Sequence, residues 1–234
     1  MLRSLAAFAR FRQNNSLRYT ECDVTPPHNK SSKLFTIGHS NLDLGDFVAN
    51  LANHEIRLVC DVRSRPASHR FPQFNREPLE ACLAAASIKY EFLGDFLGGR
   101  PSDPGVYHAD GIVNYEERRK AADFRAGIDQ ALELSHVSAI ALMCAEEDPL
   151  YCHRFLMICP ALIERGVTPR HIRRGGELES QREAEDRLLK ANDLAAFDSS
   201  SLFVSERDEA LKDALRRQAK EFAFRASAEA IEYF

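Results

Sequence analysis

The chain of 234 residues lacks long apolar runs, a compact set of cysteines and an excess of basic residues. No uninterrupted apolar run approaches the roughly 20 residues of a transmembrane helix, so the sequence predicts no membrane span. The six cysteines form no compact framework and no secretory signal is recognisable before them, which favours a reduced, cytoplasmic setting over a disulfide scaffold. Basic residues are not in excess either. The formal net charge of −4 excludes a globally basic nucleic-acid binder, but it does not exclude a local basic patch.

The composition present is that of a soluble globular protein, with 44% hydrophobic and 28% charged residues. Residues 1–32 differ from the rest, because they carry four arginines and no acid before Glu21, and they end in a proline-containing break. A targeting segment is one interpretation of this composition. A disordered extension or a misassigned start is the preferred one, since nothing resembles a cleavage site, and the extension is left out of the predicted fold.

Residues 33–175 alternate between strand and helix patterns, which predicts one α/β domain. The predicted class is a mostly parallel, Rossmann-like sheet with helices on both faces. Residues 94–111 form a glycine- and proline-bearing segment that is long for a connector and is a candidate lid or binding loop. Strands are predicted at 34–38, 57–62, 89–93, 137–143 and 170–173, and helices at 42–54, 78–87, 124–134 and 155–163.

Residues 176–234 predict a C-terminal helical appendage. A charged helix is expected at 177–189, followed by a break at 198–201. Leu211, Leu215 and Phe222 form a stripe with the spacing of a final helix.

Polar side chains follow three of the predicted strands at the point where each ends. If the strands are parallel, these side chains meet at one edge of the sheet, where open α/β folds bind ligands. The three clusters are His39-Ser40-Asn41, Asp61 with Arg63 and Arg65, and Cys144 with Glu146. Each cluster alone has a structural interpretation, such as a loop-capping histidine or an N-cap aspartate, but their coincidence at three strand ends favours a site.

Several of these residues lie in motifs that recur in a known family. The motifs are Thr36-Ile37-Gly38-His39-Ser40, Asp61-Val62-Arg63 with Pro66 and Ser68, Phe74-Asn75, Leu97-Gly98-Gly99, Cys144-Ala145-Glu146 and Cys152-His153-Arg154. In this respect the chain, over about residues 34–174, resembles the family catalogued as domain of unknown function 488. The resemblance implies one α/β domain and marks those positions, but it implies no activity.

The spacing of the cysteines disfavours both an oxyanion-binding loop and a zinc site. A strand, a cysteine, a loop and a helix carrying an arginine resemble the oxyanion-binding loops of rhodaneses and cysteine phosphatases. The spacing from Cys144 to Arg154 is longer than in those loops, and three acids between them would repel an anion. A zinc site from Cys144, Cys152 and His153 is disfavoured because adjacent residues of a helix point about 100° apart. No metal site is therefore assigned, and Cys152 is interpreted as a small buried apolar residue.

The segment 61–76 gives the stronger signal for binding. It holds four arginines against the single acid Asp61, with aromatic side chains between them. Guanidinium groups bind phosphate through two parallel hydrogen bonds, and aromatic rings can stack on a base. The alternative of equal weight is that the arginines pair with Glu146, Glu147 or Asp148 across the edge.

Two functions from different classes remain open. The first, which the mixed set of side chains favours, is an enzyme acting on a phosphate-bearing substrate, a nucleotide or nucleic acid. The second is a non-catalytic module that binds nucleic acid or a protein partner through the same edge. Neither a cofactor nor an oligomeric state follows from the sequence. The predicted catalytic residues are His39, Asp61, Cys144 and Glu146, and the predicted phosphate-binding residues are Arg63, Arg65 and Arg154.

Overall fold

The computed structural model describes residues 33–197 and 204–227, so the predicted extension 1–32 lies outside the described residues. The described chain forms a six-stranded sheet with the order β3-β2-β4-β1-β5-β6. Neighbouring strands run parallel except for the antiparallel pair β5 and β6. The strands are β1 (Leu34–Gly38), β2 (Leu58–Asp61), β3 (Lys89–Phe92), β4 (Ile140–Cys144), β5 (Arg170–Ile172) and β6 (Leu178–Ser180).

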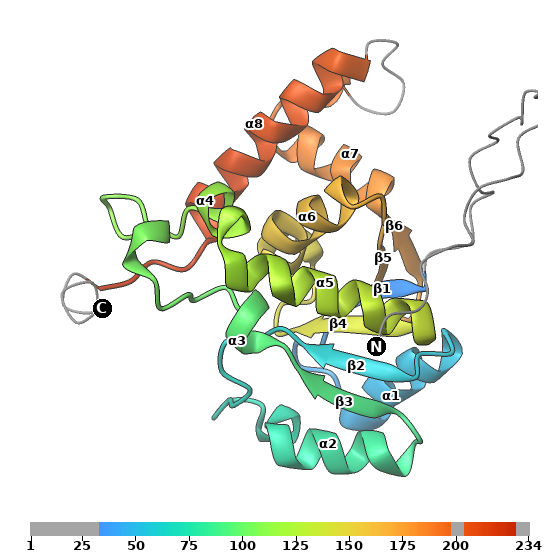
Figure 1. Cartoon of the computed structure of the whole chain (residues 1–234). Coiled ribbons are helices and arrows are strands. Elements are labelled where there is room, and N and C mark those ends of the chain that lie inside the picture. Colours follow the sequence, from blue (N-terminus) through green and yellow to red (C-terminus); the bar gives the residue numbers. More distant parts are fainter. Residues whose placement is uncertain (1–32, 198–203, 228–234) are drawn as a thin grey trace, which may run out of the picture. The chain divides into compact units, whose positions relative to one another are not determined.

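The predicted α/β class with a mostly parallel sheet is confirmed (Figure 1). The strand order differs from that of the dinucleotide-binding fold, because β4 lies between β2 and β1. The helices are α1 (Leu44–Asn53), α2 (Arg76–Ala85), α3 (Gly94–Leu97), α4 (Tyr115–Lys120), α5 (Ala122–Val137), α6 (Cys159–Glu164), α7 (Gln181–Ala191) and α8 (Val204–Phe222). Short 3-10 turns occur at η1 (Pro72–Phe74), η2 (Pro104–Val106), η3 (Pro149–Tyr151) and η5 (Ala195–Phe197), and η4 (Arg154–Ile158) is a π-helical turn.

Two hydrophobic cores cover the two faces of the sheet, and alternate residues of β4 divide between them. Leu142 packs in the core that contains α5 and α6, whereas Met143 packs with α1 and α2 on the other face. This alternation follows from the two-residue period of a strand. Both faces are apolar because helices bury both, as Figure 1 shows for α2 and α5 on opposite sides.

The local structure departs from the sequence pattern around β4. Residues 137–143 were expected to form one strand, but Val137 ends α5 with its side chain 83% exposed, and β4 begins at Ile140. The expected helix 155–163 is a π-helical turn followed by α6. Asp148 caps the short turn η3 by accepting a hydrogen bond from the backbone N–H of Leu150, so it does not begin the long helix directly.

The C-terminal helices pack on the main core. Ala184 and Leu188 of α7 and Ala214 of α8 are buried together with residues of β4. β6 lies beyond residue 175, where the α/β domain was predicted to end, and Ser180 and Glu183 form a capping box at the start of α7. The part of the chain that the structure describes contains no helix long and apolar enough to cross a membrane.

Candidate functional site

The predicted polar clusters meet at the carboxyl edge of the sheet. Gly38 at the end of β1 pairs with Cys144 at the end of β4, and Asp61 at the end of β2 pairs with Met143. The backbone N–H of His39 donates to the carbonyl oxygen of Cys144 at 3.0 Å. The structure therefore brings the three strand ends together as expected.

A cavity of about 700 Å³ opens at this edge. Its lining combines guanidinium, carboxylate, thiol and imidazole groups with a set of aromatic rings. The polar lining includes His39, Arg63, Arg65, His69, Arg70, Arg100, Cys144, Glu146 and His153, and the aromatic lining is Phe71, Tyr115, Tyr151, Phe222 and Phe224.

Gly38 allows the loop after β4 to approach β1. A Cβ atom at this position would overlap the carbonyl oxygen of Glu146. Only glycine therefore fits here, and the backbone of Glu146 is held directly against the end of β1.

Asp61 and Arg63 form a buried ion pair beneath the cavity. Arg63 donates from Nε to Oδ1 of Asp61 at 2.9 Å and from Nη2 to Oδ2 at 2.6 Å. Nη2 also donates to the carbonyl oxygen of Phe74, and the hydroxyl of Tyr90 donates to Oδ2 of Asp61. Asp61 is 0% exposed and Arg63 6% exposed, so the two residues predicted for catalysis and phosphate binding mainly satisfy each other.

His39 is held as a neutral ring. Its Nδ1 lies 2.9 Å from the carbonyl oxygen of Ser40 and its Nε2 lies 3.2 Å from Nη1 of Arg63, so Nδ1 donates and Nε2 accepts. The ring stacks on Phe74. Burial lowers the pKa of His39 to about 4, with the nearby Arg63 charge acting in the same direction. Because both ring nitrogens already have hydrogen-bond partners, His39 is placed to position its neighbours and not to exchange a proton with a ligand.

Arg154 lies away from the cavity, in contrast to its predicted phosphate-binding role. The side chain is 0% exposed. Its guanidinium donates to the carbonyl oxygens of Glu146 and Glu147 and to Oγ1 of Thr36. A buried guanidinium that binds backbone carbonyls fixes the loop after β4 and has no exposed face for a phosphate.

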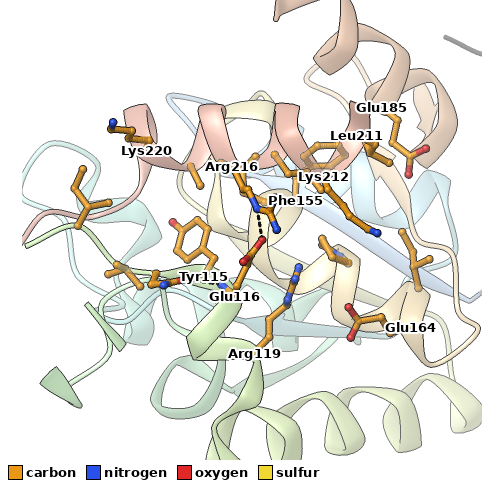
Figure 2. Close-up of a pocket in the computed structure, with 18 of the residues that line it drawn as sticks. Tyr115, Glu116, Arg119, Phe155, Glu164, Glu185, Leu211, Lys212, Arg216 and Lys220 are labelled. Carbon is orange, nitrogen blue, oxygen red and sulfur yellow. Dashed lines mark hydrogen bonds and ion pairs between the residues drawn. The ribbon is translucent and has the colours of Figure 1, made fainter. Parts of the chain in front are cut away.

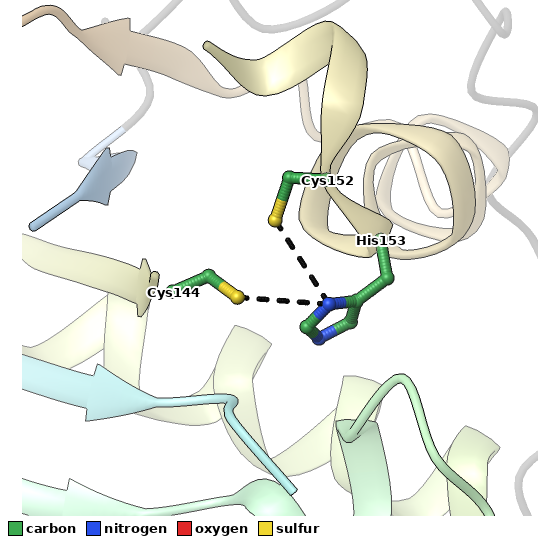
Figure 3. Close-up of side chains that lie close together, drawn as sticks. All are labelled: Cys144, Cys152 and His153. Carbon is green, nitrogen blue, oxygen red and sulfur yellow. Dashed lines mark hydrogen bonds between the residues drawn. The ribbon is translucent and has the colours of Figure 1, made fainter. Parts of the chain in front are cut away.

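Cys144, Cys152 and His153 point toward one another (Figure 3). Nδ1 of His153 lies 3.6 Å from Sγ of Cys144 and 3.9 Å from Sγ of Cys152. The S–H group of Cys144 donates to Oε2 of Glu146 at 3.1 Å. Cys152 and His153 were not expected to converge, because adjacent residues of one helix point apart. Cys152 has extended backbone angles instead, φ −131° and ψ 139°.

Burial and mutual contact shift the acidities of these groups. The hydrogen bond with Cys152, together with burial, raises the pKa of the Cys144 thiol well above its ordinary value. Although burial opposes it, the contact with Cys144 and the charge of Arg154 hold the pKa of the Cys152 thiol well below its ordinary value. Burial also raises the pKa of Glu146.

Three arginines at the cavity are free of carboxylate partners among the described residues. Arg65, Arg70 and Arg100 are exposed. Arg70 lies over the ring of Phe71 and Arg100 over the ring of Phe224. The acids expected to pair with them are used elsewhere: Glu147 pairs with Arg173, and Asp148 with Arg187.

A second cavity of about 920 Å³ lies under α8, bounded by α4, α6 and α7 (Figure 2). Glu116 and Arg216 pair across it, and Phe155 and Leu211 contribute apolar lining. None of the predicted site residues lines this cavity. The cavity at the carboxyl edge is therefore the better candidate.

The sequence missed several members of the site. Arg100 lies in the predicted binding loop 94–111 but was not singled out there. Phe222 and Phe224 come from the C-terminal segment, which was given no functional role, and only the packing of α8 brings them to the sheet edge. His153 was considered as a metal ligand next to Cys152, but it was rejected because the two residues were expected to share a helix. The sequence feature that could have identified His153 as a site residue is the family motif Cys152-His153-Arg154.

Comparisons with known proteins support the family resemblance and no more. The family described as "Domain of unknown function DUF488" matches residues 43–158, which include Asp61, Cys144, Glu146 and His153. The predicted resemblance to this family is confirmed. No curated protein and no solved structure matches the chain.

Proposed function

We propose that this protein is an enzyme that acts on a phosphate-bearing substrate of the nucleotide class at the carboxyl edge of its sheet. One observation supports the proposal above the others. Exposed guanidinium groups with no carboxylate partner among the described residues line the same cavity as the exposed carboxylate of Glu146 and the buried thiol of Cys144. A cavity that combines anion-binding groups with convergent reactive groups is typical of an enzyme site.

The arginines and aromatic rings supply binding. Arg65, Arg70 and Arg100 can each bind phosphate oxygens through two parallel hydrogen bonds. Tyr151 and Phe222, which are 47% and 40% exposed and have ring centroids 4.7 Å apart, can stack against a base.

Glu146 supplies acid-base chemistry in this proposal. It lines the cavity, accepts a hydrogen bond from Cys144, and its backbone is held by Gly38 and Arg154. Asp61, Arg63 and His39 are assigned to positioning, because their polar atoms are occupied by one another. The free thiol of Cys144, which lines the site, also suits the predicted cytoplasmic setting.

Binding of labelled nucleotides and short single-stranded oligonucleotides tests the proposal. Affinity should fall as salt rises, and the double variant R65A/R100A should weaken it while the R57A variant should not. Arg57 is a matched control because it is exposed and precedes β2 at the opposite edge of the sheet.

Turnover separates an enzyme from a binding module. Incubation with a panel of nucleotides, read by mass spectrometry, should give a product that is lost in Glu146→Gln by roughly 10²–10⁴-fold in rate. Binding without any product would support the non-catalytic module instead. Absence of both binding and product would overturn the proposal.

A further inference from the structure

We propose that Cys144, Cys152 and His153 bind one divalent transition-metal ion of the zinc type, with a fourth coordination position open to the cavity at the carboxyl edge. Two thiolates and an imidazole are the ligands that zinc prefers. The inference goes beyond the proposed function and does not depend on it, because the metal would be bound whatever the substrate.

The spacing of the ligand atoms fits a tetrahedral ion. Zinc–sulfur bonds of about 2.3 Å and zinc–nitrogen bonds of about 2.0–2.1 Å place sulfur and nitrogen ~3.5 Å apart and two sulfurs ~3.8 Å apart. The two sulfur–nitrogen distances are 3.6 and 3.9 Å, and all three ligand atoms lie within 4.8 Å of one another. The two sulfur–nitrogen distances are therefore within a few tenths of an ångström of those in a tetrahedral site.

The imidazole of His153 is already oriented for binding. Its Nε2 lies 2.9 Å from the carbonyl oxygen of Val62 and must carry the proton to donate there. In the neutral ring this leaves the lone pair of Nδ1 directed at the two sulfurs. Gly99 packs against the ring, and a Cβ at this position would come within 2.9 Å of Cγ of His153.

The surroundings balance the charge of such a site. The backbone N–H of Arg154 donates to Sγ of Cys152 at 3.5 Å, the kind of contact that stabilises a thiolate ligand. Two thiolates neutralise a divalent ion, and the remaining charges of Glu146 and Arg154 are opposite in sign. These groups are present beside the cluster without any rearrangement of the fold.

Three protein ligands with an open fourth position are typical of catalytic rather than structural zinc sites. Cys144 and His153 line the cavity, as does Glu146, whose Oε2 lies 3.1 Å from Sγ of Cys144. An open fourth position would therefore be reachable from the cavity, with the carboxylate of Glu146 close to the site.

Metal titration of the full chain under reducing conditions tests the inference. We expect one zinc ion per chain after purification, and cobalt(II) added to the chelator-treated protein should give thiolate-to-metal charge-transfer absorption. The C144S, C152S and H153A variants should each weaken cobalt affinity more than about 10-fold, since loss of a supporting contact alone costs about 10–100-fold. The variant C82S, which removes a cysteine of α2 outside the cluster, should bind as wild type.

The cobalt spectrum of the wild-type chain keeps the inference testable even if a variant fails to fold. Absence of stoichiometric binding by zinc, cobalt, iron and nickel would overturn the proposal. Metal binding that survives both C144S and C152S would also overturn it. The same holds if protein purified in reducing buffer contains a disulfide between Cys144 and Cys152 in place of the metal.

Discussion

The side chain of Arg63 folds back onto Asp61, two residues earlier, and places Nη2 2.6 Å from Oδ2 in a buried ion pair. The pair lies directly beneath the cavity, between the ends of β1 and β2, where Arg63 also contacts His39. The sequence had placed Arg63 and Arg65 together as phosphate-binding groups. The fold separates them, because one is enclosed and the other faces solvent.

Arg63→Ala should therefore destabilise the protein far more than Arg65→Ala. Arg63→Ala leaves the Asp61 carboxylate buried without its cation and should lower the free energy of unfolding by about 3–5 kcal/mol. Arg65→Ala removes an exposed charge and should change it by less than about 0.5 kcal/mol. Urea unfolding of both variants measures this, and equal stability of the two would contradict the assignment.

Arg154→Lys should destabilise the protein although the charge is kept. An ammonium group cannot reproduce the separate contacts of the guanidinium with the carbonyl oxygens of Glu146 and Glu147. Loss of one or two such hydrogen bonds should cost about 2–4 kcal/mol in unfolding free energy. Arg182→Lys on the exposed face of α7 is the control and should leave the free energy of unfolding unchanged. An unchanged free energy of unfolding in Arg154→Lys would show that the loop after β4 does not depend on the two contacts of the guanidinium.

Gly38→Ala tests the close approach of β1 to the loop after β4. The added methyl group overlaps the carbonyl oxygen of Glu146, so the loop must shift, and overpacking of this kind costs about 1–3 kcal/mol. Gly45→Ala in α1 meets nothing within 4 Å and should be neutral or stabilising by up to about 1 kcal/mol. Unfolding free energies and cobalt binding of both variants provide the measurement. Wild-type behaviour of Gly38→Ala would mean that the loop is not held there.

Acid sensitivity should come in part from His171, which is fully buried between Thr36 and Gln181. Burial, with the charges of Arg154, Arg173 and Arg187, lowers its pKa from 6.5 to about 3. Between these values the unfolded chain binds a proton that the folded protein does not. The stability contributed by the neutral ring is therefore fully present above pH 6.5 and is lost as the pH falls, by up to about 1.4 kcal/mol per pH unit.

Urea unfolding of wild type and His171→Asn at pH 7, 6 and 5 measures this contribution. The variant should show a shallower loss of unfolding free energy on acidification, whatever its stability at pH 7. His136→Asn, at an exposed position on α5, should keep the wild-type slope. Identical slopes in wild type and His171→Asn would assign the acid sensitivity to other groups.

The sequence determined five of the six strands that the described residues form, most of the helices and the edge at which the site lies; β6 (Leu178–Ser180) falls within the predicted helix 177–189. Leu34–Gly38 forms a strand with the predicted bounds, and Phe47 and Leu51 are buried on α1 as their spacing predicts. These features could be read because they depend on local periodicity, and because parallel strands necessarily bring their carboxyl ends to one edge. The positions of His39, Asp61 and Cys144 at that edge followed without further information.

Only the tertiary structure decided what each side chain at the edge does. The contacts that enclose the pair of Asp61 and Arg63 come from Phe74 and Tyr90, and those that orient His153 come from Val62, 91 residues earlier in the chain. Nothing in a local pattern distinguishes an arginine enclosed by such distant partners from one facing solvent, so Arg65 and Arg154 look alike in the sequence. The extended backbone at Cys152, which lets two adjacent residues converge, is likewise set by the short turn before it and by the buried π-helical turn that follows.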